Sequence, residues 1–130
     1  MKSIFIRGFA FAALAVILGA FGAHTLKTLI SPEQLQTFET GILYQFYHSF
    51  ALIICGLLYE KLNQKLVRLS ANLFTVGICC FSFSVYLLAC RDLLGIQSWW
   101  WLGPVTPFGG MLFISAWVIL LVAAIKLNEK

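Results

Sequence analysis

The chain has 130 residues, of which 61% are hydrophobic and only 11% are charged. Soluble domains carry about 25% charged residues, and a soluble fold of this length could not hide so much apolar surface. Composition therefore excludes a soluble enzyme, a disordered chain and a nucleic-acid-binding protein, and predicts that lipid solvates part of the chain. The net charge of +4 needs no acidic partner, because the basic residues flank the apolar runs.

Charged residues divide the chain into four apolar stretches, each long enough for a helix to cross a hydrocarbon core about 30 Å thick. No strand-like alternation is present, so helices rather than a closed barrel are expected to satisfy the backbone in lipid. We predict one domain over residues 1–130, an all-α integral membrane protein folded as an antiparallel four-helix bundle. The expected spans are about residues 6–25, 41–60, 69–90 and 107–126.

A short amphipathic helix is predicted at the outer interface, between the first and second spans. Ser31, Pro32 and Gln34 form a capping-box pattern with proline at the first helical position. One apolar stripe follows on an otherwise polar turn, at Leu35, Phe38 and Ile42. We expect this helix to run into the second span with a bend at Gly41.

The segment before the last span, from Trp99 to Gly110, is rich in helix breakers, so the span itself is expected to start near 107. Three consecutive tryptophans from Trp99 to Trp101 are typical of an aromatic belt at the headgroup level. A partly re-entrant segment around Pro104 and Pro107 is the alternative interpretation.

The distribution of basic residues predicts an inner-membrane protein with both termini in the cytoplasm. The N-terminal segment, the middle loop and the C-terminal tail hold Lys2, Arg7, Lys61, Lys65, Arg68, Lys126 and Lys130. The opposite loops hold only Lys27 and Arg91. A signal peptide cleaved near Ala20–Gly22 is an alternative that would move the N-terminus outside.

Small residues recur at three- and four-residue spacing along the first span. They are Gly8, Ala12, Ala15, Gly19, Gly22 and Ala23. Such a face lets helices approach closely in lipid, which favours packing within the chain over the alternative of a homo-oligomer interface.

The polar residues within the spans are few, and they fall toward the outer half of the membrane. Gln45 and His48 share a face of the second span, and His24 ends the first span on the same side. The third span carries a polar stripe that should turn toward the bundle interior, formed by Asn72, Thr75, Cys79, Ser82 and Tyr86. Arg91 and Asp92 close that span near the same level.

His24 and His48 have two interpretations. Neutral imidazoles from two helices can ligate a haem iron or contribute to a metal site. Alternatively, each ring donates one hydrogen bond and fixes a helix pair. Because no carboxylate or close thiolate completes the ligand set, we assign no metal and no cofactor. The cysteines (Cys55, Cys79, Cys80 and Cys90) form no C-x-x-C pair and are expected to behave as small hydrophobes.

Several motifs in matching order resemble a known family. They are Gly19-Ala-Phe-Gly-Ala-His24, Tyr44-Gln-Phe-Tyr-His48, and Leu102-Gly-Pro-Val-Thr-Pro-Phe-Gly-Gly110 with Trp117. The sequence is similar to the uncharacterised membrane family called domain of unknown function 423, whose animal relatives are called transmembrane protein 256. The resemblance implies a small four-span inner-membrane protein, usually bacterial, with no established reaction, substrate or cofactor. Phe83 and Ala116 stand where relatives commonly have glycine, and both add bulk at close helix contacts.

We therefore expect a non-enzymatic membrane protein whose outer-half polar cluster binds a small or lipid-like ligand or supports assembly. The alternatives are a bis-histidine haem or metal redox protein and, least favoured, a small transporter, for which the spans lack an embedded carboxylate. The expected partner is the lipid bilayer, a homo-oligomer is the alternative named above, and nucleic acid is not expected. The candidate polar site comprises His24, Tyr44, Gln45, His48, Ser82, Tyr86 and Arg91. The candidate helix-packing residues are Gly19, Gly22, Gly109, Gly110 and Trp117.

Overall fold

The computed structural model describes residues 1–129, and this part of the chain is helical without strands. Four helices are long and apolar enough to cross a membrane: α1 (Lys2–His24), α2 (Pro32–Leu58), α3 (Gln64–Ala89) and α5 (Leu102–Ile125). The shorter elements are the helix α4 (Arg91–Leu94) and the 3-10 turns η1 (Leu26–Thr28) and η2 (Lys126–Glu129).

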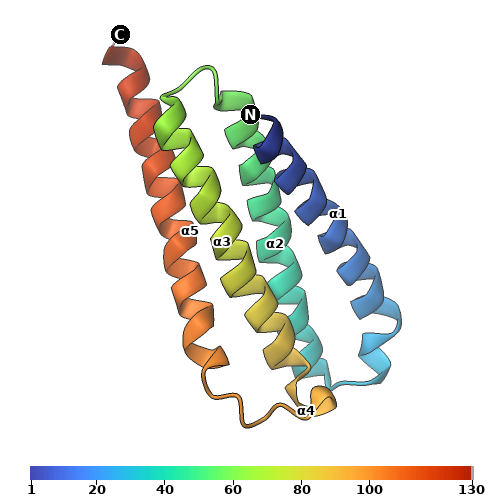
Figure 1. Ribbon diagram of the computed structural model, residues 1–130. Coiled ribbons are helices and arrows are strands. Elements are labelled where there is room, and N and C mark those ends of the chain that lie inside the picture. The colour runs from blue at the N-terminus through green and yellow to red at the C-terminus, as the bar shows by residue number, and fades with distance from the viewer. Residues whose placement is uncertain (130) are drawn as a thin grey trace.

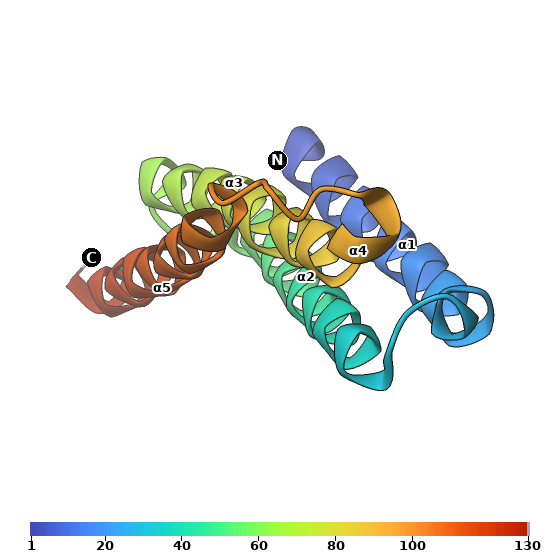
Figure 2. The same ribbon diagram turned by 90° about the horizontal axis from the view of Figure 1, so that it is seen from below.

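The long helices pack in chain order, α1 on α2, α2 on α3 and α3 on α5. Successive long helices run in opposite directions, so the N-terminus, the α2–α3 connection and the end of α5 meet at one end of the molecule (Figure 1). We call this the terminal end, and the opposite end, which carries α4, the loop end. Seen along the helices, α1 and α5 lie on either side of the central α2–α3 pair (Figure 2).

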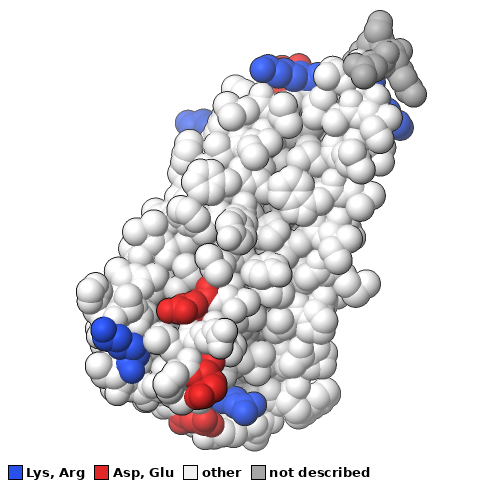
Figure 3. Space-filling view, turned by 180° about the vertical axis from the view of Figure 1, so that it is seen from behind, with Lys and Arg blue, Asp and Glu red and all other residues white. Residues whose placement is uncertain are grey.

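On the face shown in Figure 3, charged side chains gather toward the two ends of the molecule and leave a broad uncharged band between them. Large apolar side chains on the outward faces of α1 and α5 are more than half exposed, including Phe9, Ile17, Ile114 and Leu121. Water tolerates no apolar surface of this extent on a monomer, whereas lipid tails cover it without cost. The band is therefore the lipid-facing surface.

The predicted capping box is confirmed at the start of α2. The Ser31 hydroxyl accepts a hydrogen bond from the Gln34 backbone at 3.2 Å, and the Gln34 side chain accepts one from the Ser31 backbone at 2.9 Å. The structure does not separate an amphipathic helix from the second span, because Pro32–Leu58 is one helix. Gly41 lies within it as a packing position, since a Cβ there would lie 2.6 Å from the Tyr86 ring.

α5 begins at Leu102, five residues before the start predicted for the last span at 107. Pro104 falls in the first helical turn, where backbone N–H groups have no helical partner, so it is tolerated there. Only Pro107 removes a hydrogen bond from within the helix, and transmembrane helices accommodate such a loss. The stretch after Leu102 therefore belongs to one continuous helix, α5.

The other long helices also begin before the predicted span starts. They begin at Lys2, Pro32 and Gln64, whereas the spans were expected to start at 6, 41 and 69. Hydropathy marks the part of a helix that lies in hydrocarbon, while the helix itself continues into the headgroup region. Capping residues such as Ser31 and Asn63 then set the true starts.

α3 and α5 approach closely at two glycines that face the partner helix. A Cβ on Gly77 would lie 2.6 Å from the Phe113 ring, and a Cβ on Gly109 would lie 2.5 Å from the backbone nitrogen of Phe81. Each helix therefore provides the space that the other fills, which fixes the register of α5. A Cβ on Gly110 would have more room, because its nearest neighbour, the Phe81 ring, would lie at 4.0 Å.

The small-residue face of α1 packs against α2. A Cβ on Gly8 would lie 2.8 Å from the Ile53 side chain, and one on Gly22 would lie 3.2 Å from the Phe38 ring. A Cβ on Gly19 would be less crowded, because its nearest neighbour, the Ile42 side chain, would lie at 3.9 Å. This face is therefore occupied within the chain.

Candidate functional site

Gln45 is fully buried and joins three helices. Its side-chain nitrogen donates to the carbonyl of Phe11 on α1 at 2.8 Å, and its side-chain oxygen accepts from the Tyr86 hydroxyl on α3 at 2.7 Å. Buried amides are costly without hydrogen-bond partners, and here both ends of the amide are paired. Gln45 and Tyr86 thus fasten α1, α2 and α3 together.

Ser82 lies one helical turn before Tyr86 and is completely buried. Within residues 1–129 its hydroxyl oxygen is the buried side-chain polar atom that lacks a hydrogen-bond partner. Of the predicted stripe on α3, Ser82 and Tyr86 face the interior, whereas Cys79 is exposed. The expectation that the whole stripe turns inward was therefore wrong for Cys79 and for Asn72, which is also exposed.

His48 lies in a box of aromatic rings contributed by α2, α3 and α5. It stacks on Phe113 with ring centroids 3.6 Å apart and planes 5° from parallel. Phe74, Tyr44 and Trp117 complete the box, with ring centroids 5.6, 5.9 and 6.3 Å from that of His48. We call these five residues the His48 box. Because Gly77 makes room for Phe113, close α3–α5 packing brings the stacking partner to the histidine.

A backbone hydrogen bond fixes the tautomer of His48. Its Nδ1 lies 2.6 Å from the carbonyl oxygen of Tyr44, which can only accept, so Nδ1 carries the proton. In the neutral ring Nε2 is then an acceptor, and the described residues give it no partner. His48 itself is 7% exposed, but the flanking Tyr44 and Trp117 are 40% and 44% exposed. The box therefore borders the lipid-facing surface.

His24 and His48 do not meet. His24 is exposed at the loop end of α1, two residues beyond Gly22, which packs on Phe38. From Phe38 to His48 the rise along α2 is about 15 Å. Two nitrogens bound to one ion lie only about 4 Å apart, so these two histidines of one chain cannot ligate the same metal or haem iron. Among the described residues, no group of three or more His, Cys, Asp or Glu is placed to hold a metal ion.

Arg91 lies outside the His48 box, on α4 at the loop end. It lines a surface pocket of about 320 Å³ with residues of the first turns of α2, among them Glu33 and Thr37. The neighbouring Asp92 accepts a hydrogen bond from the Gln34 side chain at 2.7 Å. These contacts tie α4 to the start of α2, so Arg91 is separated from the predicted cluster.

Sequence reasoning missed Phe74 and Phe113, which supply two walls of the box. A signal for Phe113 was present, because it stands four residues after Gly109 and four before Trp117, on one face of α5. Phe74 carries no such signal, since a phenylalanine inside an apolar span is ordinary.

Arg7 was also missed as a contact between helices. Its Nη1 donates to Asn72 at 3.0 Å and to Thr75 at 2.9 Å, joining α1 to α3 near the terminal end. In the sequence Arg7 indicates topology only, because its partners on α3 come from tertiary structure.

Apolar helices of membrane length and an uncharged band between the charged ends define an α-helical multi-pass membrane protein. The family model described as "Protein of unknown function (DUF423)" matches residues 18–110. The chain belongs to this family.

Two relatives cover almost the whole chain. The UPF0382 membrane protein YwdK of Bacillus subtilis (strain 168) is 39% identical over 127 residues, which are 97% of this chain and 98% of the relative. The UPF0382 membrane protein SAB0533 of Staphylococcus aureus (strain bovine RF122 / ET3-1) is 38% identical over 126 residues, with the same coverage of 97% and 98%. No solved structure matches.

Proposed function

We propose that this protein is a non-enzymatic, four-span protein of the cell inner membrane that binds the polar group of a lipid-like molecule at the His48 box. The observation that carries the proposal is the environment of His48. One imidazole nitrogen is committed to a carbonyl, while the other is an acceptor beside a stacked aromatic ring at the lipid-facing surface.

The charge distribution supports an orientation with the terminal end in the cytoplasm. The terminal end carries Lys2, Arg7, Lys61, Lys65, Arg68 and Lys126. The loop end carries only Lys27 and Arg91 as cations, together with Glu33, Glu39 and Asp92. Because basic residues remain on the cytoplasmic side, the first turns of α2 then lie in the outer headgroup region.

The depth of His48 supports a membrane-soluble ligand. In the proposed orientation His48 lies about 18 Å along α2 from Glu60 at the cytoplasmic end, just beyond the centre of a hydrocarbon core about 30 Å thick. Molecules reach this depth through lipid rather than from water. The ligand class that fits is an amphiphile whose hydroxyl or amide donates to Nε2 while its apolar body rests on Tyr44 or Trp117.

The surroundings of His48 favour binding over catalysis. Its described neighbours are a carbonyl oxygen and aromatic rings, which include no serine hydroxyl or cysteine thiol for the imidazole to activate. Nucleophilic catalysis requires such a pair within hydrogen-bonding distance. A hydrogen-bond acceptor among aromatic rings is the usual composition of a binding pocket for an amphiphile.

His48→Phe tests this proposal, because phenylalanine keeps an aromatic ring against Phe113 but removes the acceptor. The wild-type protein and the variant would be purified in a mild detergent, and the bound small molecules extracted and identified by mass spectrometry. We expect a lipid-soluble compound in near-stoichiometric amount in the wild type and its loss from His48→Phe.

Ser115→Ala is the matched control, since Ser115 is an exposed hydroxyl on α5 that bonds only to its own helix at Met111. Thermal unfolding followed by circular dichroism is the check that the wild type, His48→Phe and Ser115→Ala are all folded. Equal amounts of the same compounds in all three would contradict the proposal.

A further inference from the structure

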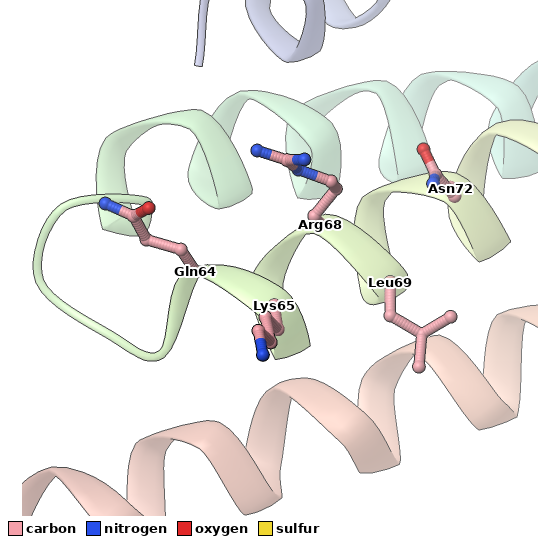
Figure 4. A pocket seen from close by; sticks show the side chains of 5 residues that line it. All are labelled: Gln64, Lys65, Arg68, Leu69 and Asn72. Atoms are coloured by element: carbon pink, nitrogen blue, oxygen red, sulfur yellow. The ribbon is translucent and has the colours of Figure 1, made fainter.

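A second polar site lies at the terminal end of α3, at the opposite end of that helix from α4. It is a pocket of about 430 Å³, within the usual range of about 300–1,000 Å³ for small-molecule sites (Figure 4). The residues that line it are Gln64, Lys65, Arg68, Leu69 and Asn72. Its lining thus contains two cations and two amides but no carboxylate.

The guanidinium group of Arg68 is held in place from within the protein. It donates a hydrogen bond to the Tyr59 hydroxyl at the end of α2 and lies over the Tyr59 ring, 5.8 Å from its centroid. Arginine combines such stacking with several further N–H donors and stays charged at any physiological pH. Arg68 can therefore receive an anion without first being ordered.

Asn72 connects the pocket to a third cation, Arg7, which does not itself line it. Its side-chain oxygen accepts a hydrogen bond from Arg7 on α1, so its amide N–H groups remain as donors toward the pocket. At the other edge, Gln64 donates to the Glu60 carboxylate at 3.2 Å. Arg7, Lys65 and Arg68 therefore outweigh the one acidic group nearby, and the site is electropositive.

The pocket also lies where the charged terminal end meets the uncharged band. Leu69 is 48% exposed, and in Figure 4 its side chain leaves α3 on the side opposite to Arg68. Lys65 lies one helical turn before Leu69 on the same side of α3, and an apolar side chain beside a basic one suits a ligand that has both an anionic group and a hydrocarbon chain. A free anion would gain nothing from Leu69.

We infer that this pocket binds the phosphate of an anionic phospholipid of the leaflet at the terminal end. Lys65 and Arg68 contact the phosphate oxygens, Asn72 donates a further hydrogen bond, and an acyl chain runs along Leu69. Clusters of basic side chains at the membrane surface attract anionic lipids by charge, and a guanidinium pairs with two phosphate oxygens at once. This site is independent of the one proposed at His48.

The test uses the full-length protein in nanodiscs made of equal amounts of phosphatidylcholine and phosphatidylglycerol, with the retained lipids measured by native mass spectrometry. We expect the wild type to retain phosphatidylglycerol preferentially. Lys65→Gln and Arg68→Gln should each reduce this preference by about ten-fold, because each removes a direct charge-assisted hydrogen bond to the phosphate. Lys65 is exposed, so its replacement leaves the fold intact even where the loss of the Arg68–Tyr59 contact is destabilising.

Lys61→Gln is the matched control, because it removes a positive charge at the same end from a residue that does not line the pocket. We expect this variant to keep the wild-type lipid preference. An equal loss of preference in Lys61→Gln and Lys65→Gln would show only general attraction by charge and would overturn the site. Displacement of phosphatidylglycerol by added inorganic phosphate would indicate a free anion as ligand and would overturn the assignment to lipid.

Discussion

The hydroxyl of Tyr86 on α3 donates a hydrogen bond of 2.7 Å to the side-chain oxygen of Gln45 on α2, and both residues are buried. The same amide donates to Phe11 on α1. The side chain of Gln45 therefore has hydrogen-bond partners for both its nitrogen and its oxygen, and these partners lie on two neighbouring helices. Removing it leaves the Tyr86 hydroxyl without a partner in an apolar interior.

Gln45→Leu should lower the free energy of unfolding by about 1–3 kcal/mol, since it leaves a buried hydroxyl unpaired. Tyr86→Phe should cost about 1 kcal/mol in the wild-type background. In the Gln45→Leu background the same change should cost nothing, because the hydroxyl has already lost its partner. Unfolding in SDS followed by circular dichroism measures all three variants. Additive losses in the double variant would contradict the pairing.

Gly109→Ala should separate α3 from α5. The new Cβ would lie 2.5 Å from the backbone nitrogen of Phe81 and 2.9 Å from its Cα, and backbone atoms cannot move aside. Overpacking of this kind costs about 1–3 kcal/mol or more. Gly103→Ala is the control, because nothing lies within 4 Å of its Cβ position and alanine is the better helix former. Thermal unfolding in detergent should show a lower midpoint for Gly109→Ala only.

Several elements could be predicted from the sequence because they depend on local chemistry. Hydropathy located the four spans, and the capping box at Ser31 correctly marked a helix start. The helix breakers before Phe108 suggested a later helix start than Leu102, because the sequence alone does not show that Pro104 lies in a first helical turn. Of the candidate site, Gln45 and His48 are buried as polar residues within a span should be.

The rest of the site depends on contacts between helices that are far apart in the chain. Of the rings that surround His48, only Tyr44 is close to it in the sequence; Phe74, Phe113 and Trp117 come from α3 and α5, and nothing near His48 in the sequence specifies them. His24 has the same residue type as His48 and was predicted on the same side of the membrane, but it is exposed at a helix end. Helix register and rotation separate the two histidines, and hydropathy determines neither.

Arg7→Met should destabilise the contact between α1 and α3. Its guanidinium group bonds to both Asn72 and Thr75, and hydrogen bonds between membrane helices contribute about 1–2 kcal/mol. Lys2→Met removes an exposed charge from the same end and should change the free energy of unfolding very little. SDS unfolding of the two variants tests this, and equal stabilities would rule out a structural role for Arg7.

Cys90 should react slowly with maleimides at neutral pH. It follows the last residue of α3, and burial raises the pKa of its thiol. A raised pKa lowers the fraction of reactive thiolate below the folded pKa, so labelling should accelerate as the pH rises toward that value. The measurement uses a variant with alanine at the other cysteines, and an impermeant maleimide added outside intact cells.

Ser98→Cys, in a chain without other cysteines, is the exposed control and should label faster at neutral pH. In the proposed orientation both single-cysteine proteins react from outside. Labelling of either one only after the cells are opened would contradict the orientation. Equal rates for both at neutral pH would contradict the burial of Cys90.

The insertion of Phe113 against Gly77 has a consequence for biosynthesis. α5 is the last of the long helices to be translated, and it brings both Phe113 and Trp117 to His48. While the first three long helices are in the membrane and α5 is still on the ribosome, the histidine has neither of these two rings beside it. The ligand binding proposed at His48 would therefore require a chain that includes α5, and a product that ends before α5 would lack both rings.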